Sequence, residues 1–275
     1  MAILRPAVIL LTLAAALQAQ SLVPNPVLST IYPAGGRVGS SFEVTVTGAD
    51  LDDAARLHFS SAGIDSKPKL NAQDKPEPNR FVVTISPDAR RGVCEVRVIA
   101  RYGISNPRTF VVGTLPESVV PDSHTSAGKA FKAGINSALN GHAVKNAATY
   151  VSFEVTKGQR VFAVCRPTEL DSRMDATVSL ADAGGRVLAR LKPDGLLDFT
   201  PSSDGICTLC IHDLLFRGGD EFPWRILLTT APLVEYVFSD GRNVEGWNCQ
   251  DRYHTGNSGH SLWLCFKKNT IRRCS

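Results

Sequence analysis

Alternating apolar and polar residues recur along most of the chain, and this period of two predicts β-strands with one buried face. In the clearest run, residues 42–47, Phe42, Val44 and Val46 alternate with polar residues. Similar runs occupy residues 81–85, 94–100, 151–155, 207–211 and 224–228, with turn-forming residues between them. Residues 161–165 are apolar on both faces, which predicts a central strand. Short strands separated by turns are typical of all-β sandwiches.

Breaks in this pattern divide the chain into segments. Residues 28–113 and 128–230 each predict one β-sandwich. Residues 114–127 are rich in Pro and Ser, lack apolar periodicity and predict an inter-domain linker. Alternation is nearly absent from residue 231 onward, so we expect residues 231–275 to form a divergent, poorly structured tail.

The N-terminus predicts export. Arg5 supplies a basic start, residues 7–17 are apolar, and small residues allow cleavage after Ala19 or after Ala16. This pattern is typical of a secretory signal peptide over residues 1–19, and its apolar part is too short for a membrane span. An uncleaved anchor is the alternative. We expect a periplasmic, cell-surface or extracellular protein with no membrane span after cleavage.

The composition of the chain limits which partners and which cysteine chemistry are expected. The net charge of +4 is mild, and the Lys and Arg residues form no stripe with interleaved aromatic residues. Nucleic acid is therefore not an expected partner. The seven cysteines are an odd number, which leaves at least one unpaired within the chain. Cys207 and Cys210 lie three apart on a predicted strand and point to opposite faces, so we expect core packing there instead of a metal or redox motif.

Three segments of the first sandwich resemble a known family. Residues 31–36 (IYPAGG), 42–51 (FEVTVTGADL) and 104–110 (ISNPRTF) resemble the immunoglobulin-like IPT/TIG module. The resemblance implies an immunoglobulin-like sandwich that serves as a spacer or binding unit.

The second sandwich resembles the bacterial pre-peptidase C-terminal domain, a jelly-roll-like β-sandwich found beside catalytic domains in secreted enzymes. The matching residues are 157–159 (KGQ), 170–172 (LDS), Asp175, Asp182, Gly185, 198–200 (DFT), Asp204, Gly205 and 213–222. The tandem of the two modules behind a signal peptide also resembles the front of large exported proteins of planctomycete-type bacteria.

No cofactor is expected, although some members of this second family bind calcium through an acidic, Asn-containing segment at the start of the domain. Here residues 121–126 carry a single carboxylate, and Ala148-Thr149 precede Tyr150 where an Asp is usual, so the family-type site is not implied. Other candidate calcium ligands, if the fold brings them together, are Asp171, Asp175, Asp198 and Asp213. The alternative role for them is turn capping, which suits Asp.

Three hypotheses account for the unusual tail. The reading frame has shifted and the chain is truncated, the tail is a divergent natural extension, or it binds zinc. The candidate zinc ligands are Cys249, His254, His260 and Cys265. Their spacing falls at the loose end for structural zinc, and the close Cys–Cys pair that usually opens such a site is missing. We favour the first hypothesis.

No catalytic motif is present in the sequence, so no catalytic residue is assigned and we do not expect an enzyme. His212 beside Asp213 is the best catalytic-looking pair, but adjacent strand residues face opposite ways. The leading hypothesis is a non-catalytic exported protein that acts as a binding or spacer module for a protein or polysaccharide ligand. The alternatives are the accessory N-terminal portion of a larger secreted hydrolase, and a small enzyme with an unrecognised site.

Overall fold

The computed structural model describes residues 24–193, 195–231, 249–254 and 261–265. Within these ranges the regular structure consists of strands and two short 3-10 helices, η1 (Ala127–Lys129) and η2 (Pro167–Leu170), which confirms the predicted all-β class. None of the described helices has the length and apolar character needed to cross a membrane. The predicted signal peptide, residues 1–19, lies outside the described residues.

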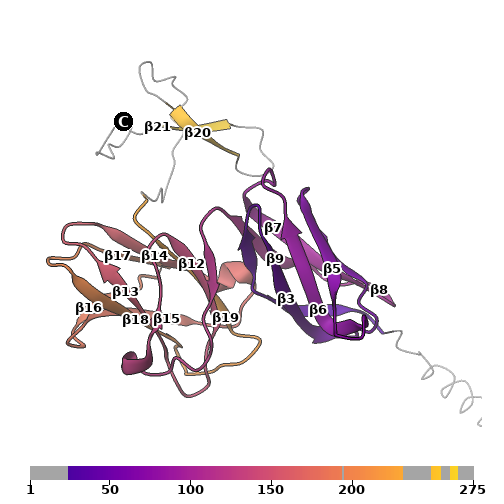
Figure 1. Cartoon of the computed structure of the whole chain (residues 1–275), viewed down its shortest axis with the longest axis horizontal. Helices are drawn as coiled ribbons and strands as arrows, with labels where there is room; N and C mark the ends of the chain where they lie inside the picture. Colours follow the sequence, from indigo (N-terminus) through magenta and orange to yellow (C-terminus); the bar gives the residue numbers. More distant parts are fainter. Residues whose placement is uncertain (1–23, 194, 232–248, 255–260, 266–275) are drawn as a thin grey trace, which may run out of the picture. The chain divides into compact units, whose positions relative to one another are not determined.

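The first sandwich has the strand order of an immunoglobulin fold (Figure 1). One sheet runs β1 (Val27–Tyr32), β3 (Ser41–Ala49), β6 (Pro76–Ile85), β5 (Ile64–Leu70). The other runs β2 (Gly35–Arg37), β9 (Arg108–Gly113), β7 (Gly92–Ala100), β4 (Arg56–Phe59), with β8 (Gly103–Ile104) also paired to β7. If β1, β3, β4, β5, β6, β7 and β9 are lettered A to G, the sheets are A-B-E-D and C-F-G, and β2 adds a strand parallel to G. The predicted immunoglobulin-like class is therefore confirmed.

The two faces of these sheets differ in chemistry, as strand alternation requires. The inward positions form a core that includes Val44, Phe81 and Phe110. Outward on β3 and β6, Glu43 accepts hydrogen bonds from Lys69 Nζ at 2.8 Å and Arg80 Nη2 at 2.7 Å. This is an ordinary charged, solvated sheet face.

The second sandwich consists of two five-stranded sheets. One runs β10 (Glu117–Val119), β12 (Ser137–His142), β19 (Pro223–Thr229), β14 (Val161–Cys165), β17 (Leu196–Phe199). The other runs β11 (Phe131–Lys132), β13 (Thr149–Val155), β18 (Gly205–Asp213), β15 (Ala176–Asp182), β16 (Val187–Arg190). The eight strands from β12 to β19 are shared four and four between the sheets in jelly-roll order, as predicted.

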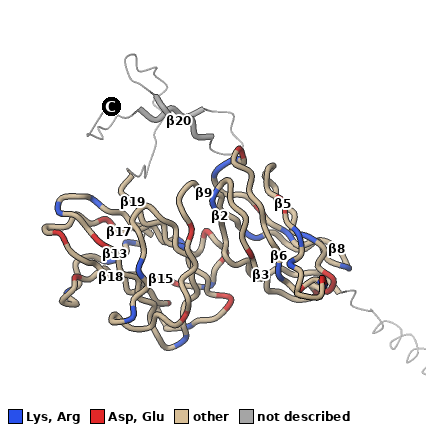
Figure 2. The backbone as a smooth tube through the Cα atoms, in the orientation of Figure 1, with Lys and Arg blue, Asp and Glu red and all other residues tan. Residues whose placement is uncertain are grey.

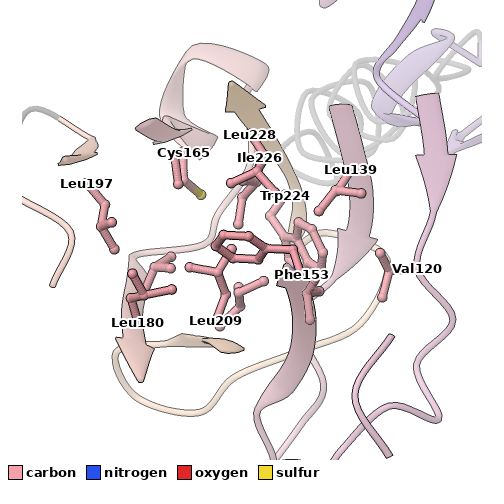
Figure 3. Close-up of a cluster of buried hydrophobic side chains, with 14 of the residues drawn as sticks. Val120, Leu139, Phe153, Cys165, Leu180, Leu197, Leu209, Trp224, Ile226 and Leu228 are labelled. Carbon is pink, nitrogen blue, oxygen red and sulfur yellow. The ribbon is translucent and has the colours of Figure 1, made fainter. Parts of the chain in front are cut away.

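The core of this sandwich lies between its two sheets. In Figure 3 the side chains of Phe153, Leu209 and Trp224 meet in that space, and all three are buried. The predicted central strand is β14, which pairs with both β19 and β17. Cys207 is buried and Cys210 is partly exposed, so the two do face opposite ways.

One of the predicted segments, the linker, differs from the structure. Residues 114–127, expected to be a linker, contain β10, which pairs in parallel with β12 and so belongs to the second sandwich. A three-residue strand is too short to show alternation in the sequence. The tail, expected to be poorly structured, contains β20 (Cys249–His254) paired antiparallel with β21 (Ser261–Cys265). Residues 232–275 form a unit separate from residues 1–231.

Contacts join the two sandwiches within the first unit. The Tyr32 ring lies 3.8 Å from the His142 ring, centroid to centroid, and Tyr32 Oη donates to Asn140 O at 3.2 Å. Thr109 N donates to Asp171 Oδ2 at 2.7 Å. Burial raises the pKa of Tyr32 and lowers that of His142, because both charged forms would lose water here.

Candidate binding surface

Three neighbouring strands of the second sandwich present a continuous outward face. On it, Tyr150 of β13 pairs with Cys210 of β18, which pairs with Ser179 of β15. Ser152 pairs with Thr208, and Thr177 pairs with His212. The alternate residues of the same strands are buried in the core, so these side chains point to the outside, where each is half-buried. We call this set the hydroxyl face: Tyr150, Ser152, Thr177, Ser179, Thr208, Cys210 and His212.

The hydroxyl face contains no Asp, Glu, Lys or Arg. Charged residues lie at its border, where Glu154 is the next outward residue of β13 after Ser152, Lys132 of β11 pairs with Ser152, and Arg190 of β16 pairs with Ser179. Acidic and basic residues are otherwise interspersed along both sandwiches (Figure 2). A protein surface normally carries about a quarter to a third charged residues, as on the outward side of β3 and β6. The uncharged patch therefore stands apart from the rest of the surface.

Tyr150 contributes an aromatic ring with a polar end at the centre of this face. Cys210, its cross-strand neighbour, is the main cause that raises the pKa of the Tyr150 phenol. The backbone N–H of Tyr150 donates to His124 O at 2.8 Å. The phenol is consequently neutral at ordinary pH, and the backbone that carries it is fixed by the sheet and by this bond.

The connection from β18 to β19 is anchored by Asp213, whose side chain is completely buried. Arg217 donates to it twice, from Nε to Oδ2 at 2.9 Å and from Nη2 to Oδ1 at 2.8 Å. The backbone N–H groups of Asp175, Leu215 and Arg217 also donate to this carboxylate. These bonds, led by the one from the Arg217 side chain, hold the pKa of Asp213 far below its ordinary value.

Further backbone contacts fix the same connection. Phe216 N donates to Asp213 O at 2.8 Å, and Asn146 N donates to Phe216 O at 2.9 Å. Gly218 packs so closely that a Cβ there would lie 2.3 Å from Lys145 N. Phe216 itself has φ 52°, a left-handed conformation that is unfavourable for an aromatic residue. The surrounding contacts determine this conformation.

The anchored connection exposes three consecutive apolar side chains, which we call the apolar loop: Leu214, Leu215 and Phe216. They are 56%, 71% and 41% exposed, respectively. The Phe216 ring stacks on the His212 ring, with centroids 4.3 Å apart and planes 2° from parallel. The apolar loop is thus continuous with the hydroxyl face through His212.

His212 and Asp213, the pair that looked catalytic in the sequence, both have structural partners. Asp213 does not bond the His212 ring with its carboxylate. Instead, His212 Nδ1 lies 2.9 Å from the backbone oxygen of Asp213, and the carboxylate is occupied by Arg217 and the backbone. A carboxylate so engaged does not orient the imidazole as a catalytic dyad requires.

Three of the four candidate calcium ligands, Asp171, Asp198 and Asp213, have carboxylates that accept hydrogen bonds from protein groups. Asp213 binds Arg217 and also accepts a bond from the backbone of the exposed Asp175. Asp171 accepts the bond from Thr109 N, and Asp198 Oδ1 accepts one from Arg160 Nε at 2.8 Å. In the described part of the chain, no three His, Cys, Asp or Glu residues are grouped so as to hold a metal ion. Calcium binding by this set stays a prediction.

The candidate zinc ligands divide between the ends of a hairpin. Cys249 pairs with Cys265 at one end, and His254 pairs with Ser261 at the other. Five residues of strand separate the ends by about 17 Å, whereas zinc bonds are about 2.0–2.3 Å long. His260 lies outside the described residues. The hairpin therefore does not bring Cys249, His254 and Cys265 to one point.

Sequence reasoning missed both parts of this surface. No motif marks the hydroxyl face, because its residues come from three strands and meet only through the sheet register. The apolar loop did leave a signal. Three consecutive apolar residues that follow a strand and precede Gly218-Gly219 are unusual at an exposed turn unless they serve a function.

No protein-family model matches the sequence, and no curated protein matches it. Among solved structures, the chain is similar to the pre-peptidase C-terminal domain of a collagenase from Bacillus anthracis, at 10% identity over 42% of this chain and 99% of that chain, with a TM-score of 0.30. It is also similar to PliG, a periplasmic inhibitor of g-type lysozyme from Aeromonas hydrophila, at 11% identity over 41% and 96% of the respective chains and a TM-score of 0.28.

A third similar structure is SGBP-B of a mixed-linkage glucan utilization locus from Bacteroides ovatus, solved with a mixed-linkage heptasaccharide. It has 10% identity over 72% of this chain and 73% of that chain, with a TM-score of 0.25. TM-scores this low carry no functional argument, so function has to be inferred from the residues of this chain. The resemblances to the IPT/TIG module and to planctomycete-type proteins stay predictions.

Proposed function

We propose that this chain is a non-catalytic, exported binding module that holds a neutral polysaccharide against the hydroxyl face. The observation that carries the proposal is the contiguous, uncharged arrangement of Tyr150, Ser152, Thr177, Ser179 and Thr208 across three paired strands. All five side chains end in a hydroxyl group.

The chemistry of these groups favours a neutral ligand rich in hydroxyl groups. A hydroxyl both donates and accepts hydrogen bonds, so it can pair with a sugar hydroxyl in either orientation. A charged polymer would find no opposite charge within the face, because charges of both signs lie only at its border, and it would lose water from its own charges. The rings of Tyr150 and His212 add apolar surface for the carbon-bound hydrogens of a sugar ring.

The rigid mounting of the face supports binding as its role. The sheet fixes its backbone, and the bond from Tyr150 N to His124 O adds a further restraint beside the aromatic residue. Groups held in position before a ligand arrives lose less conformational entropy on binding. Binding is favoured over catalysis because the His212–Asp213 pair is occupied structurally.

Affinity gel electrophoresis of the purified protein tests this proposal. The gels contain neutral polymers (mixed-linkage β-glucan, xyloglucan, glucomannan) or acidic ones (alginate, polygalacturonate). We expect at least one neutral polymer, and neither acidic polymer, to retard the protein. Thr208→Lys should weaken that retardation about tenfold or more, since it places a bulky charged side chain on β18, the middle strand of the face.

The matched control is Thr84→Lys, at an exposed outward position of β6 in the first sandwich. It adds the same charge and bulk to a sheet face that is already charged, so retardation should be unchanged. Migration unaffected by every neutral polymer would refute the proposal. Equal weakening by both lysine variants would also refute it.

A further inference from the structure

We infer that the polysaccharide bound by this surface carries small apolar acyl substituents, and that the apolar loop binds them. The inference rests on the proposed function and specifies its ligand class. It starts from the exposure of Leu214 and Leu215, which are 56% and 71% exposed although two large cores lie in the same chain.

The loop continues the hydroxyl face along β18. Outward positions on this strand are Thr208, Cys210 and His212, and the sheet ladder extends one step further because Leu214 N donates to Asp175 O at 2.8 Å. Alternation therefore brings Leu214 to the side of His212. A chain lying along the hydroxyl face would meet apolar side chains at the end of this row.

The loop is built to keep its apolar side chains outside. The buried Asp213 carboxylate, the Arg217 fork and the close packing of Gly218 hold the backbone, and Phe216 adopts its left-handed conformation within that framework. A flexible loop would turn its leucines toward the protein and reduce their contact with water. Strained backbone held by its surroundings is concentrated at binding sites.

The charges around the loop favour an uncharged ligand over a membrane. The exposed acidic residues Asp175, Asp220 and Glu221 outnumber the basic residues Arg173 and Lys145 in the segments that pack against it. Arg217 is already paired with Asp213. Anionic lipid headgroups would be repelled by this rim, whereas an ester-linked acetyl group is neutral and small enough to pack on two leucines.

The test compares acetylated glucomannan with the same polymer after chemical deacetylation, by affinity gel electrophoresis and isothermal titration calorimetry. The protein should bind the acetylated polymer more tightly, by about fourfold for each methyl group buried on the loop. Leu214→Ser and Leu215→Ser should each bring the ratio of the two affinities close to one, whereas the Thr84→Lys control should keep the ratio of the native protein. Both positions are exposed, so the thermal midpoint of each variant serves as the folding control.

The outcomes separate this inference from the proposed function. Equal affinity for the two polymers, or a preference that survives both serine variants, would overturn the acyl inference alone. If the protein binds neither glucomannan nor any other polymer of the neutral panel described above, the proposed function is overturned, and this inference with it.

Discussion

Asp213 and Arg217 form a two-pronged ion pair in which the carboxylate is completely buried and the guanidinium side chain is 42% exposed. Two polar groups four residues apart thus hold a loop that displays apolar residues between them. The same carboxylate receives three backbone N–H groups, so it also satisfies backbone donors just outside the ends of β15 and β18.

Removing this charge should destabilise the protein strongly. We expect Asp213→Asn to lower the free energy of unfolding by about 2–4 kcal/mol, because Arg217 and the backbone donors lose a buried charged acceptor. Denaturant titration measures the change. Asp182→Asn is the matched control, because its exposed partner Arg186 is also four residues away, and it should cost less than about 1 kcal/mol. Equal losses would contradict a special role for burial.

Acid should remove the same stabilisation. The pKa of Asp213 is far lower in the folded protein than in the unfolded chain, where it is about 3.9. The contribution of Asp213 is therefore complete above that value and is lost as the pH falls through the lower folded pKa. Denaturation midpoints measured from neutral pH down to about 2 should fall more steeply for the native protein than for Asp213→Asn. Parallel curves would show that other carboxylates dominate acid unfolding.

His142 should give a second pH effect, in a milder range. Burial beside Tyr32 lowers its pKa, and the carboxylates of Asp122 and Asp220 only partly oppose this. As the pH falls below about 6.5, the unfolded chain takes up a proton that the folded protein resists, so stability falls until the folded pKa is reached. His142→Phe should remove this dependence in thermal melts between pH 8 and 5, whereas the exposed control His58→Gln should retain it.

Gly218 should not tolerate a side chain. A methyl group there would lie 2.3 Å from Lys145 N and 2.4 Å from Ala143 O, both backbone atoms that cannot rotate away. We expect Gly218→Ala to cost about 2 kcal/mol or more and to loosen the apolar loop. Gly134→Ala, where no atom lies within 4 Å, should be nearly neutral. Chemical denaturation measures both, and similar losses would show that Gly218 is not closely packed in solution.

Phe216 should show opposite effects on folding and on binding. Asn accepts the left-handed backbone more readily, so Phe216→Asn should relieve about 1 kcal/mol of strain, offset in part by loss of the His212 stack. Its binding to polysaccharide should weaken because the ring at the end of the hydroxyl face is gone. Thermal melts and affinity electrophoresis on one preparation measure both, and a variant that is less stable yet binds normally would contradict this expectation.

The sequence predicted those strands whose pattern of apolar and polar residues is visible within the strand itself. The run at residues 42–47 lies within β3, and the run at 207–211 lies within β18, because alternation is visible in any strand that buries one face. The short strand β10 and the parallel pairing of β2 with β9 were not predicted. Both depend on partners distant in the chain, which no local pattern specifies.

The candidate binding surface could not be predicted from the sequence for the same reason. Tyr150, Ser179 and Thr208 become neighbours only when the register of three strands is set, so their common lack of charge is invisible along the chain. The role of Asp213 was also hidden. An Asp beside a His suggested chemistry, whereas the partner that decides its behaviour is Arg217, in the following turn.

The anchoring of the apolar loop has a consequence for how such a protein diversifies. The atoms that hold the loop belong to the backbone, to Asp213 and Arg217, and to the space left by Gly218, while the side chains of Leu214 and Leu215 take no part. Mutations at those two positions can accumulate without a penalty in folding. Ligand preference at this end of the surface can therefore change through these two side chains without altering the scaffold that presents them.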